Sequence, residues 1–171
     1  ETLLDPLGIA PERVHRLRGE IDPGLAAAEA ECELRGIAPR TAGGWPALDW
    51  VFLGMGEDGH VASLFPGDAF DPADRSVYVP VVGPKAPPRR LTLTYGAIAA
   101  AREVWVLVAG TGKEQALRLS LATDGVTPLA RVLQHRSKTL LFNSIPAERT
   151  SFEQDHSVAG QNPQNAVAPF G

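Results

Sequence analysis

The sequence predicts an α/β fold with a Rossmann-like, doubly wound and mostly parallel sheet. Apolar segments of strand length alternate with segments of helical pattern, and glycine-rich turns follow the predicted strands. The segment ALDWVFL, residues 47–53, is apolar almost throughout, which is typical of a parallel strand covered on both faces. With 171 residues, 44% of them apolar, the chain is long enough to bury one such core.

The elements of this fold follow in chain order. A first helix is predicted over residues 22–36, because Asp22 is a capping residue and Pro23 suits the first turn of an Ala/Glu/Leu-rich run. The strand at 47–53 comes next. Further apolar and β-branched runs predict strands at 77–82, 90–94 and 103–109, helices at 95–102 and 113–122, and an extended proline-rich loop at 83–89.

The chain is predicted to divide into one ordered domain, residues 1–142, and a flexible tail, residues 143–171. The tail has no apolar period and is rich in Gln, Asn, Pro and Ser, so it lacks the apolar side chains that a packed core requires.

Composition excludes several classes of function. The chain has 16 basic and 20 acidic residues, a formal net charge of −4, which gives no overall attraction to nucleic acid or to an anionic membrane. Cys32 is the only cysteine, so no internal disulfide is expected, and no Cys/His set has the spacing of a zinc site. No apolar run approaches the roughly twenty residues of a membrane helix. A cytoplasmic protein without a metal is predicted.

The most informative window is GMGEDGHVASLFPG, Gly54 to Gly67, directly after the first predicted strand. Its glycines allow a sharp turn whose backbone N–H groups face a ligand at the carboxyl end of a strand, where open α/β sheets bind ligands. The spacing also matches the dinucleotide fingerprint G-x-G-x-x-G. The carboxylates of Glu57 and Asp58 would repel a pyrophosphate there, so nucleotide binding is disfavoured.

His60 is the candidate general base of this window. Its imidazole takes a proton near neutral pH, and Asp58, two positions earlier, can fix its tautomer. The alternative is purely structural: His60 would cap a following helix while Asp58 would satisfy loop N–H groups. The sequence leaves both readings open.

Two basic residues are candidates for binding a phosphate group. Lys113 follows Gly110-Thr111-Gly112 at the start of a predicted helix, where a cation opposes the helix dipole unless an anion is present. Arg90 opens a predicted strand after the proline-rich loop. The alternatives are an exposed solubilising lysine and a surface ion pair.

The Gly54–Gly67 window closely resembles the signature of the 6-phosphogluconolactonase family. PPRRLTLTYGAIAAAREVWVLVAGTGKEQAL, residues 87–117, is similar to that family's second signature stretch, and residues 1–20 resemble the segment before the window. The resemblance covers roughly residues 1–133. A related branch of glucosamine-6-phosphate isomerases continues the G-x-G-x-D-G-H core differently, whereas Ala62 to Gly67 follow the lactonase form.

The resemblance implies hydrolysis of 6-phospho-D-glucono-1,5-lactone to 6-phospho-D-gluconate, without metal or cofactor. It implies that His60 is the catalytic base, that Asp58 supports it, and that Arg90 and Lys113 lie near the substrate phosphate. The window residues implied to line the substrate site are Gly54, Gly56, Glu57 and Gly59.

Two other functions stay open at this point. One is isomerisation or deamination of a sugar phosphate, and the other is sugar-phosphate binding without catalysis. The family carries a glycine-rich phosphate loop and an Asp-Glu-Arg segment on the first units of its sheet, before the part that Glu1 opens. We therefore expect the sheet to lack the family's first strands, and the isolated chain to be inactive. The sequence makes no prediction of oligomeric state.

Overall fold

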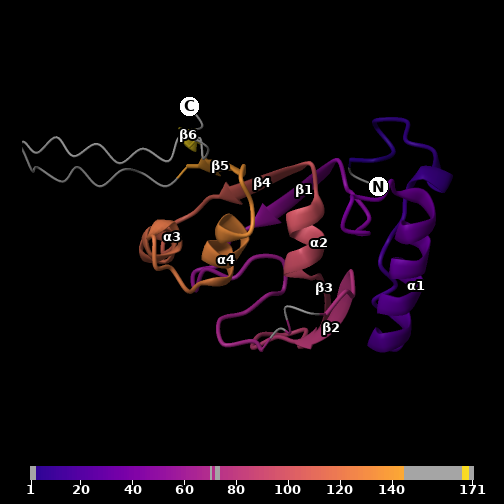
Figure 1. Ribbon diagram of the computed structural model, residues 1–171, viewed down its shortest axis with the longest axis horizontal. Helices are drawn as coiled ribbons and strands as arrows, with labels where there is room; N and C mark the ends of the chain where they lie inside the picture. Colours follow the sequence, from indigo (N-terminus) through magenta and orange to yellow (C-terminus); the bar gives the residue numbers. More distant parts are fainter. Residues whose placement is uncertain (1–2, 70, 72–73, 145–166, 170–171) are drawn as a thin grey trace, which may run out of the picture.

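The computed structural model describes residues 3–69, 71, 74–144 and 167–169. Its elements are one short 3₁₀ helix, four α-helices and six strands within those residues (Figure 1). In chain order they are η1 (Pro11–Arg13), α1 (Pro23–Ile37), β1 (Trp50–Gly54), β2 (Tyr78–Val82), β3 (Arg89–Leu93), α2 (Tyr95–Ala100), β4 (Glu103–Val108), α3 (Glu114–Leu121), α4 (Pro128–Gln134), β5 (Leu140–Asn143) and β6 (Val167–Pro169).

The main sheet has the strand order β1-β4-β5-β6, and each neighbouring pair is parallel. The predicted α/β class with a mostly parallel sheet is confirmed. In β1, Val51 and Leu53 are buried and face the helices, whereas Trp50 and Phe52 on the other face are 58% and 62% exposed. Within the described residues, one face of this sheet is therefore covered by α2, α3 and α4 and carries the apolar core. The core side chains come from β1, β4 and β5, from Met55, Val61, Leu64 and Ala101 in the loops, and from Ile98, Ala116, Leu117, Leu129 and Val132 of the three helices.

The strands predicted at 77–82 and 90–94 do not join the parallel sheet. They form β2 and β3, a separate antiparallel pair on which α1 packs (Figure 1). The physical reason is the length of the connection between them. Only residues 83–88 separate the two strands, and a parallel pair requires a crossover of a dozen residues or more.

The remaining boundaries agree with the sequence to within a few residues. The predicted helix at 22–36 corresponds to α1, and the Asp22 side chain accepts hydrogen bonds from the N–H groups of Gly24 and Leu25. The sequence did not predict α4, β5 or β6, the last of which lies within the predicted tail. Residues 145–166 and 170–171 of the predicted tail lie outside the described residues, so the division at residue 142 stays a prediction. No helix among the described residues has the length and apolar character to cross a membrane.

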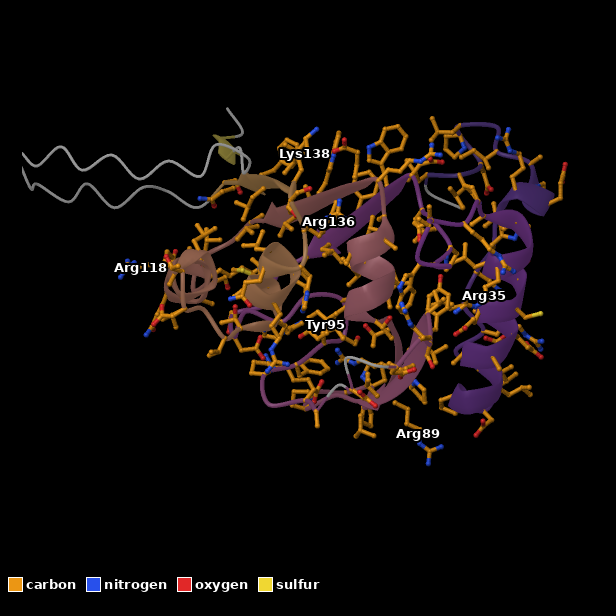
Figure 2. All side chains as sticks on the ribbon, in the orientation of Figure 1. Arg35, Arg89, Tyr95, Arg118, Arg136 and Lys138 are labelled. Carbon is orange, nitrogen blue, oxygen red and sulfur yellow. The ribbon has the colours of Figure 1, made fainter. Side chains whose placement is uncertain are left out.

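Arg136 ties the end of α2 to the segment that leads into β5. Its Nη1 group donates to the carbonyl oxygens of Ile98, Ala99 and Ala101 at 3.0, 2.7 and 2.7 Å. Carbonyls at a helix carboxyl end lack partners within the helix, so one guanidinium satisfies several at once. Figure 2 shows Arg136 between α2 and β4, whereas Arg118 of α3 extends into solvent.

We predict that Arg136→Met destabilises the chain by about 1–3 kcal/mol, because the apolar stem is kept and the partly buried carbonyls at the end of α2 lose a charged donor. Thermal unfolding followed by circular dichroism measures this loss. Arg118→Met is the matched control and should unfold close to the unmodified chain. Equal melting temperatures for the two variants would contradict the role of Arg136.

Candidate functional site

The loop after β1 turns back on itself directly at the end of the strand. The N–H of Gly56 donates to the carbonyl oxygen of His60 at 2.9 Å, and the N–H of Gly59 donates to that of Gly56 at 3.0 Å. Met55 and Val61 form an antiparallel bridge at the base of the turn, and both side chains are buried. The turn is therefore anchored at its base, while Glu57 and Asp58 within it are exposed.

Asp58 and His60 are joined twice within this turn. Asp58 Oδ1 lies 2.6 Å from His60 Nδ1 and also accepts the backbone N–H of His60 at 3.1 Å. This pairing places Nδ1 on the carboxylate and leaves Nε2 as the ring nitrogen available to other partners. The His60 side chain is 28% exposed, so water can reach it.

The environment of Asp58 favours its charged form. Partial burial raises the pKa of its carboxyl, but the hydrogen bonds from the backbone and ring of His60 outweigh this, so the pKa lies below its ordinary value. The Asp58 carboxyl is therefore charged at neutral pH beside the His60 ring.

Two of the predicted glycines lie where there is no room for a side chain. A Cβ at Gly56 would overlap the ring of His60. Gly59 has φ +80°, and a Cβ there would lie 2.9 Å from Cβ of Thr127, so this position excludes a side chain by conformation and by contact. A Cβ at Gly54 would meet no atom within 4 Å, so its predicted role gains no steric support.

The junction of α3 and α4 supports the turn from behind. The N–H of Leu129 donates to the carbonyl oxygen of Gly59 at 3.1 Å. Thr127 caps α4 through the N–H of Ala130, and its hydroxyl lies 2.7 Å from that of the buried Ser120. Sequence reasoning missed both hydroxyl residues, although Thr127 before Pro128 is a helix-start signal.

Phe65 connects His60 with Arg90. Its ring centroid lies 4.9 Å from that of the His60 ring, and the Arg90 guanidinium carbon lies 5.4 Å from the Phe65 centroid. Nε and Nη2 of Arg90 donate to the carbonyl oxygens of Pro87 and Lys85, both at 2.9 Å. The predicted phosphate residue is thus held against the same aromatic ring as the predicted base, a contact that sequence reasoning missed.

Lys113 lies at the same sheet edge but follows a different strand, β4. β1 and β4 are parallel neighbours with Gly54 opposite Leu107, so the segments that follow both strands lie together. A Cβ at Gly112 would lie 3.8 Å from Glu57 Oε1, which places Glu57 beside the turn that leads into α3. Lys113 is half-buried and, in the described part of the chain, forms no ion pair.

The structure brings most of the predicted residues together at one edge of the parallel sheet. Asp58 and His60 share the turn with Gly56 and Gly59, while Arg90 and Lys113 approach from β3 and from the start of α3. The proposed capping role of His60 is wrong, because residues 61–64 form turns and bridges rather than a helix. Asp58 does accept a loop N–H, that of His60, as the structural alternative predicted, and it also pairs with the His60 side chain. Across the described ranges, no cluster of three His, Cys, Asp or Glu side chains could hold a metal ion.

The chain is similar to known proteins of one family. A family model described as glucosamine-6-phosphate isomerases/6-phosphogluconolactonase matches residues 1–141. The chain is 37% identical over 161 residues to 6-phosphogluconolactonase of Streptomyces coelicolor, covering 87% of this chain and 60% of that protein. It is 40% identical over 134 residues to the Mycobacterium tuberculosis protein of the same name, covering 75% and 53%. The chain thus spans little more than half the length of these relatives.

Solved structures agree in fold. The chain superposes on 6-phosphogluconolactonase from Leishmania guyanensis with a TM-score of 0.60 and 32% identity, covering 71% of this chain and 50% of that one. The Thermotoga maritima 6-phosphogluconolactonase gives a TM-score of 0.64 with 27% identity, covering 80% and 58%.

We predict that His60→Ala raises the pKa of Asp58, because the ring hydrogen bond is lost while partial burial remains. Titration of the Asp58 carboxyl carbon by NMR measures the change. In the unmodified chain, the lowered pKa of Asp58 stabilises the folded state at pH values above the ordinary carboxyl pKa of about 3.9. This stabilisation is lost as pH falls through the lowered pKa of Asp58. That acid-dependent loss of stability should shrink in the variant.

His15→Ala is the control for this titration. The His15 ring bonds to Glu33 at 2.7 Å and belongs to a different part of the chain. An Asp58 titration that is the same in His60→Ala and His15→Ala would contradict the pairing of Asp58 with His60.

Proposed function

Because the chain belongs to the glucosamine-6-phosphate isomerase/6-phosphogluconolactonase family, we propose that it hydrolyses 6-phospho-D-glucono-1,5-lactone to 6-phospho-D-gluconate. The observation that carries the proposal is the Asp58–His60 pair at 2.6 Å on a turn at the carboxyl edge of a parallel sheet. Relatives named 6-phosphogluconolactonase at 37–40% identity support the choice of reaction. The single cysteine, Cys32, which leaves no internal disulfide, supports a cytoplasmic location.

His60 is the general base in this proposal. Its Nε2 takes a proton from water, and the oxygen of that water attacks the lactone carbonyl carbon. Asp58, which accepts at Nδ1, stabilises the imidazolium that forms. When the bond from the carbonyl carbon to the ring oxygen breaks, the imidazolium returns its proton to that oxygen. The products are the carboxylic acid and the freed hydroxyl, with the enzyme back in its starting state.

The loop backbone and the two cations act on other parts of the substrate. N–H groups between Gly56 and Gly59 are the candidates for stabilising the oxyanion that develops at the carbonyl oxygen. Arg90 and Lys113 bind the phosphate, which is remote from the reacting carbon and thus serves orientation. Glu57 and Gly54 complete the proposed wall of the substrate site.

We predict that His60→Ala lowers kcat for lactone hydrolysis by about 10²–10⁴-fold, the usual contribution of a general base. The assay follows acid release by a protein that carries this chain together with any sequence that precedes Glu1, and subtracts spontaneous hydrolysis. His15→Ala should match the unmodified chain. Turnover that survives in His60→Ala would overturn the assignment of the base.

The same assay separates the alternative functions. Ammonia release from glucosamine 6-phosphate would favour the isomerase branch of the family. Binding of 6-phosphogluconate with no hydrolysis above the spontaneous rate would favour a module that binds a sugar phosphate without catalysis.

We predict that Lys113→Gln raises KM by about tenfold and leaves kcat nearly unchanged, because it removes one charged hydrogen bond to the phosphate. Steady-state kinetics on the lactone measure both constants. Lys138→Gln is the control, since Lys138 pairs with Glu103 at 3.2 Å near the start of β4, the opposite end from Lys113. An equal KM in the two variants would contradict phosphate binding by Lys113.

A further inference from the structure

The first turn of α4 gives one of its N–H groups to the turn that follows β1. Pro128 has no N–H, and the N–H of Ala130 donates to the side-chain hydroxyl of Thr127 at 3.1 Å. The N–H of Leu129 donates instead to the carbonyl oxygen of Gly59 at 3.1 Å. The Gly59 carbonyl therefore forms part of the cap of α4, and the place of the turn depends on how this helix begins.

Ser120 of α3 fixes the orientation of the Thr127 hydroxyl. Ser120 Oγ donates to the carbonyl oxygen of Ala116 at 2.7 Å and lies 2.7 Å from the Thr127 hydroxyl oxygen. A hydroxyl group has one hydrogen, so the hydrogen between the two hydroxyls is that of Thr127. Ser120 is 2% exposed, so water does not replace this partner. The Thr127 hydroxyl thus accepts from α4 and donates to α3.

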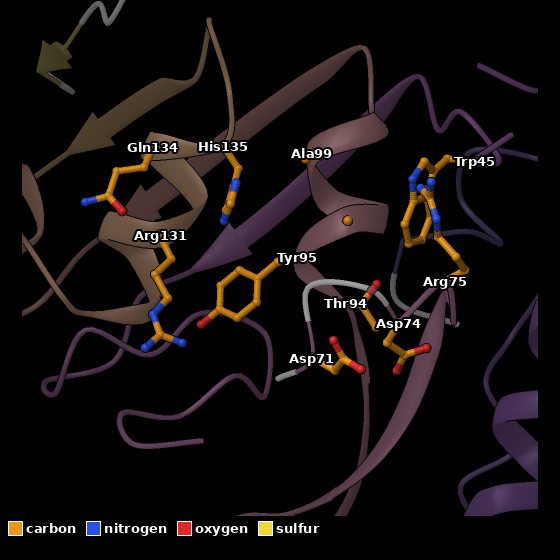
Figure 3. A pocket seen from close by; sticks show the side chains of 11 residues that line it. Trp45, Asp71, Asp74, Arg75, Thr94, Tyr95, Ala99, Arg131, Gln134 and His135 are labelled. Carbon is orange, nitrogen blue, oxygen red and sulfur yellow. The ribbon is translucent and has the colours of Figure 1, made fainter. Parts of the chain in front are cut away.

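The connection between α3 and α4 holds the two helices close together (Figure 1). A Cβ at Gly125 would lie 2.6 Å from the carbonyl oxygen of Leu119 and 2.8 Å from Cβ of Ala130. Gln134, which Figure 3 shows on α4, donates from Nε2 to the carbonyl oxygen of Gly125 at 2.9 Å. The two helices therefore form one packed support beneath the turn.

The segment from Gly112 to Ser120, which includes most of α3, contacts the turn near both of its ends. At its start, a Cβ at Gly112 would lie 3.8 Å from Oε1 of Glu57, and at its end, a Cβ at Gly59 would lie 3.3 Å from Oγ of Ser120. Lys113, a proposed phosphate residue, directly precedes α3. The same helix therefore supports the turn and carries the backbone of Lys113.

We propose that Ser120 and Thr127 are positioning residues, whose hydroxyl pair sets the place of the proposed base, His60, relative to Lys113. The proposal rests on the proposed function for its effect on catalysis. The lactone carbonyl and the phosphate belong to one substrate, so the base and the cation need a fixed spacing. Loss of the hydroxyl pair loosens the turn and leaves the phosphate contacts in place, so it lowers kcat rather than raising KM.

The test separates the two groups of the Thr127 side chain, in a protein that carries this chain together with any sequence that precedes Glu1. Thr127→Val removes the hydroxyl and keeps the two carbons that lie beside Gly59, whereas Thr127→Ser keeps the hydroxyl and removes the methyl group. We expect Thr127→Val and Ser120→Ala each to lower kcat by about tenfold, with KM within about twofold. Thr127→Ser should keep the kcat of the unmodified protein.

Thr94→Val is the matched control, because Thr94 caps α2 as Thr127 caps α4 (Figure 3). The Thr94 hydroxyl accepts the N–H of Ala97 at 3.3 Å and donates to the carbonyl oxygen of Ser76 at 2.8 Å. This variant therefore loses the same kinds of hydrogen bond at another helix. Its melting temperature should fall as that of Thr127→Val does, while its kcat should stay unchanged.

Two further measurements distinguish positioning from stability. In the His60→Ala background, Thr127→Val should not lower the residual rate further, because a positioning residue acts through the base. Amide hydrogen exchange at Gly59 should be faster in Thr127→Val than in Thr94→Val, because the turn has lost its support. This exchange is measured without substrate, so it still decides whether the hydroxyl pair holds the turn if the protein does not hydrolyse the lactone.

Three outcomes would overturn the proposal. The first is an equal kcat in Thr127→Val and Thr94→Val. The second is a loss of kcat in Thr127→Ser as large as that in Thr127→Val, which would assign the effect to methyl packing. The third is Gly59 exchange that is the same in Thr127→Val and Thr94→Val.

Discussion

The fit of one backbone turn against two helices decides where the proposed reacting groups lie. Gly59 is held by its left-handed conformation, by close contact with Thr127 and by the hydrogen bond from Leu129 to its carbonyl oxygen. Moving the turn would break the contact and the hydrogen bond together. Asp58 and His60 lie in the same turn, so the precision of their pairing depends on packing beneath it rather than on their own interaction alone.

The parallel sheet adds the second constraint. Because β1 and β4 run in the same direction in direct register, a short turn after each strand is enough to bring Glu57 and Gly112 together from positions far apart in the chain. Open α/β sheets bind ligands at this edge for that reason. The antiparallel pair β2–β3 adds Arg90 from outside the main sheet, so the site draws on both sheets.

Sequence reasoning was most successful where a local pattern determines the local structure. Asp22 before Pro23 predicted the start of α1, and the three glycines of the window predicted a sharp turn after β1. It located β2 and β3 as strands but not their antiparallel pairing outside the main sheet, because strand propensity indicates an extended segment but not its partner. It could not find the contacts of Phe65 or the pairing of Thr127 with Ser120. These depend on how distant segments pack, and one sequence carries no direct signal of that.

The shared ring of Phe65 couples His60, the proposed base, to Arg90, one of the two proposed phosphate residues. His60 and Arg90 contact the same aromatic side chain, and a Cβ at Gly83 would lie 3.1 Å from both that ring and Arg90. Residues that share a packing partner do not contribute independently, so the free-energy effects of replacing them will not add. A replacement of Arg90 that shifts the Phe65 ring therefore also shifts His60, so the position of the proposed base depends on a residue of the separate β2–β3 sheet.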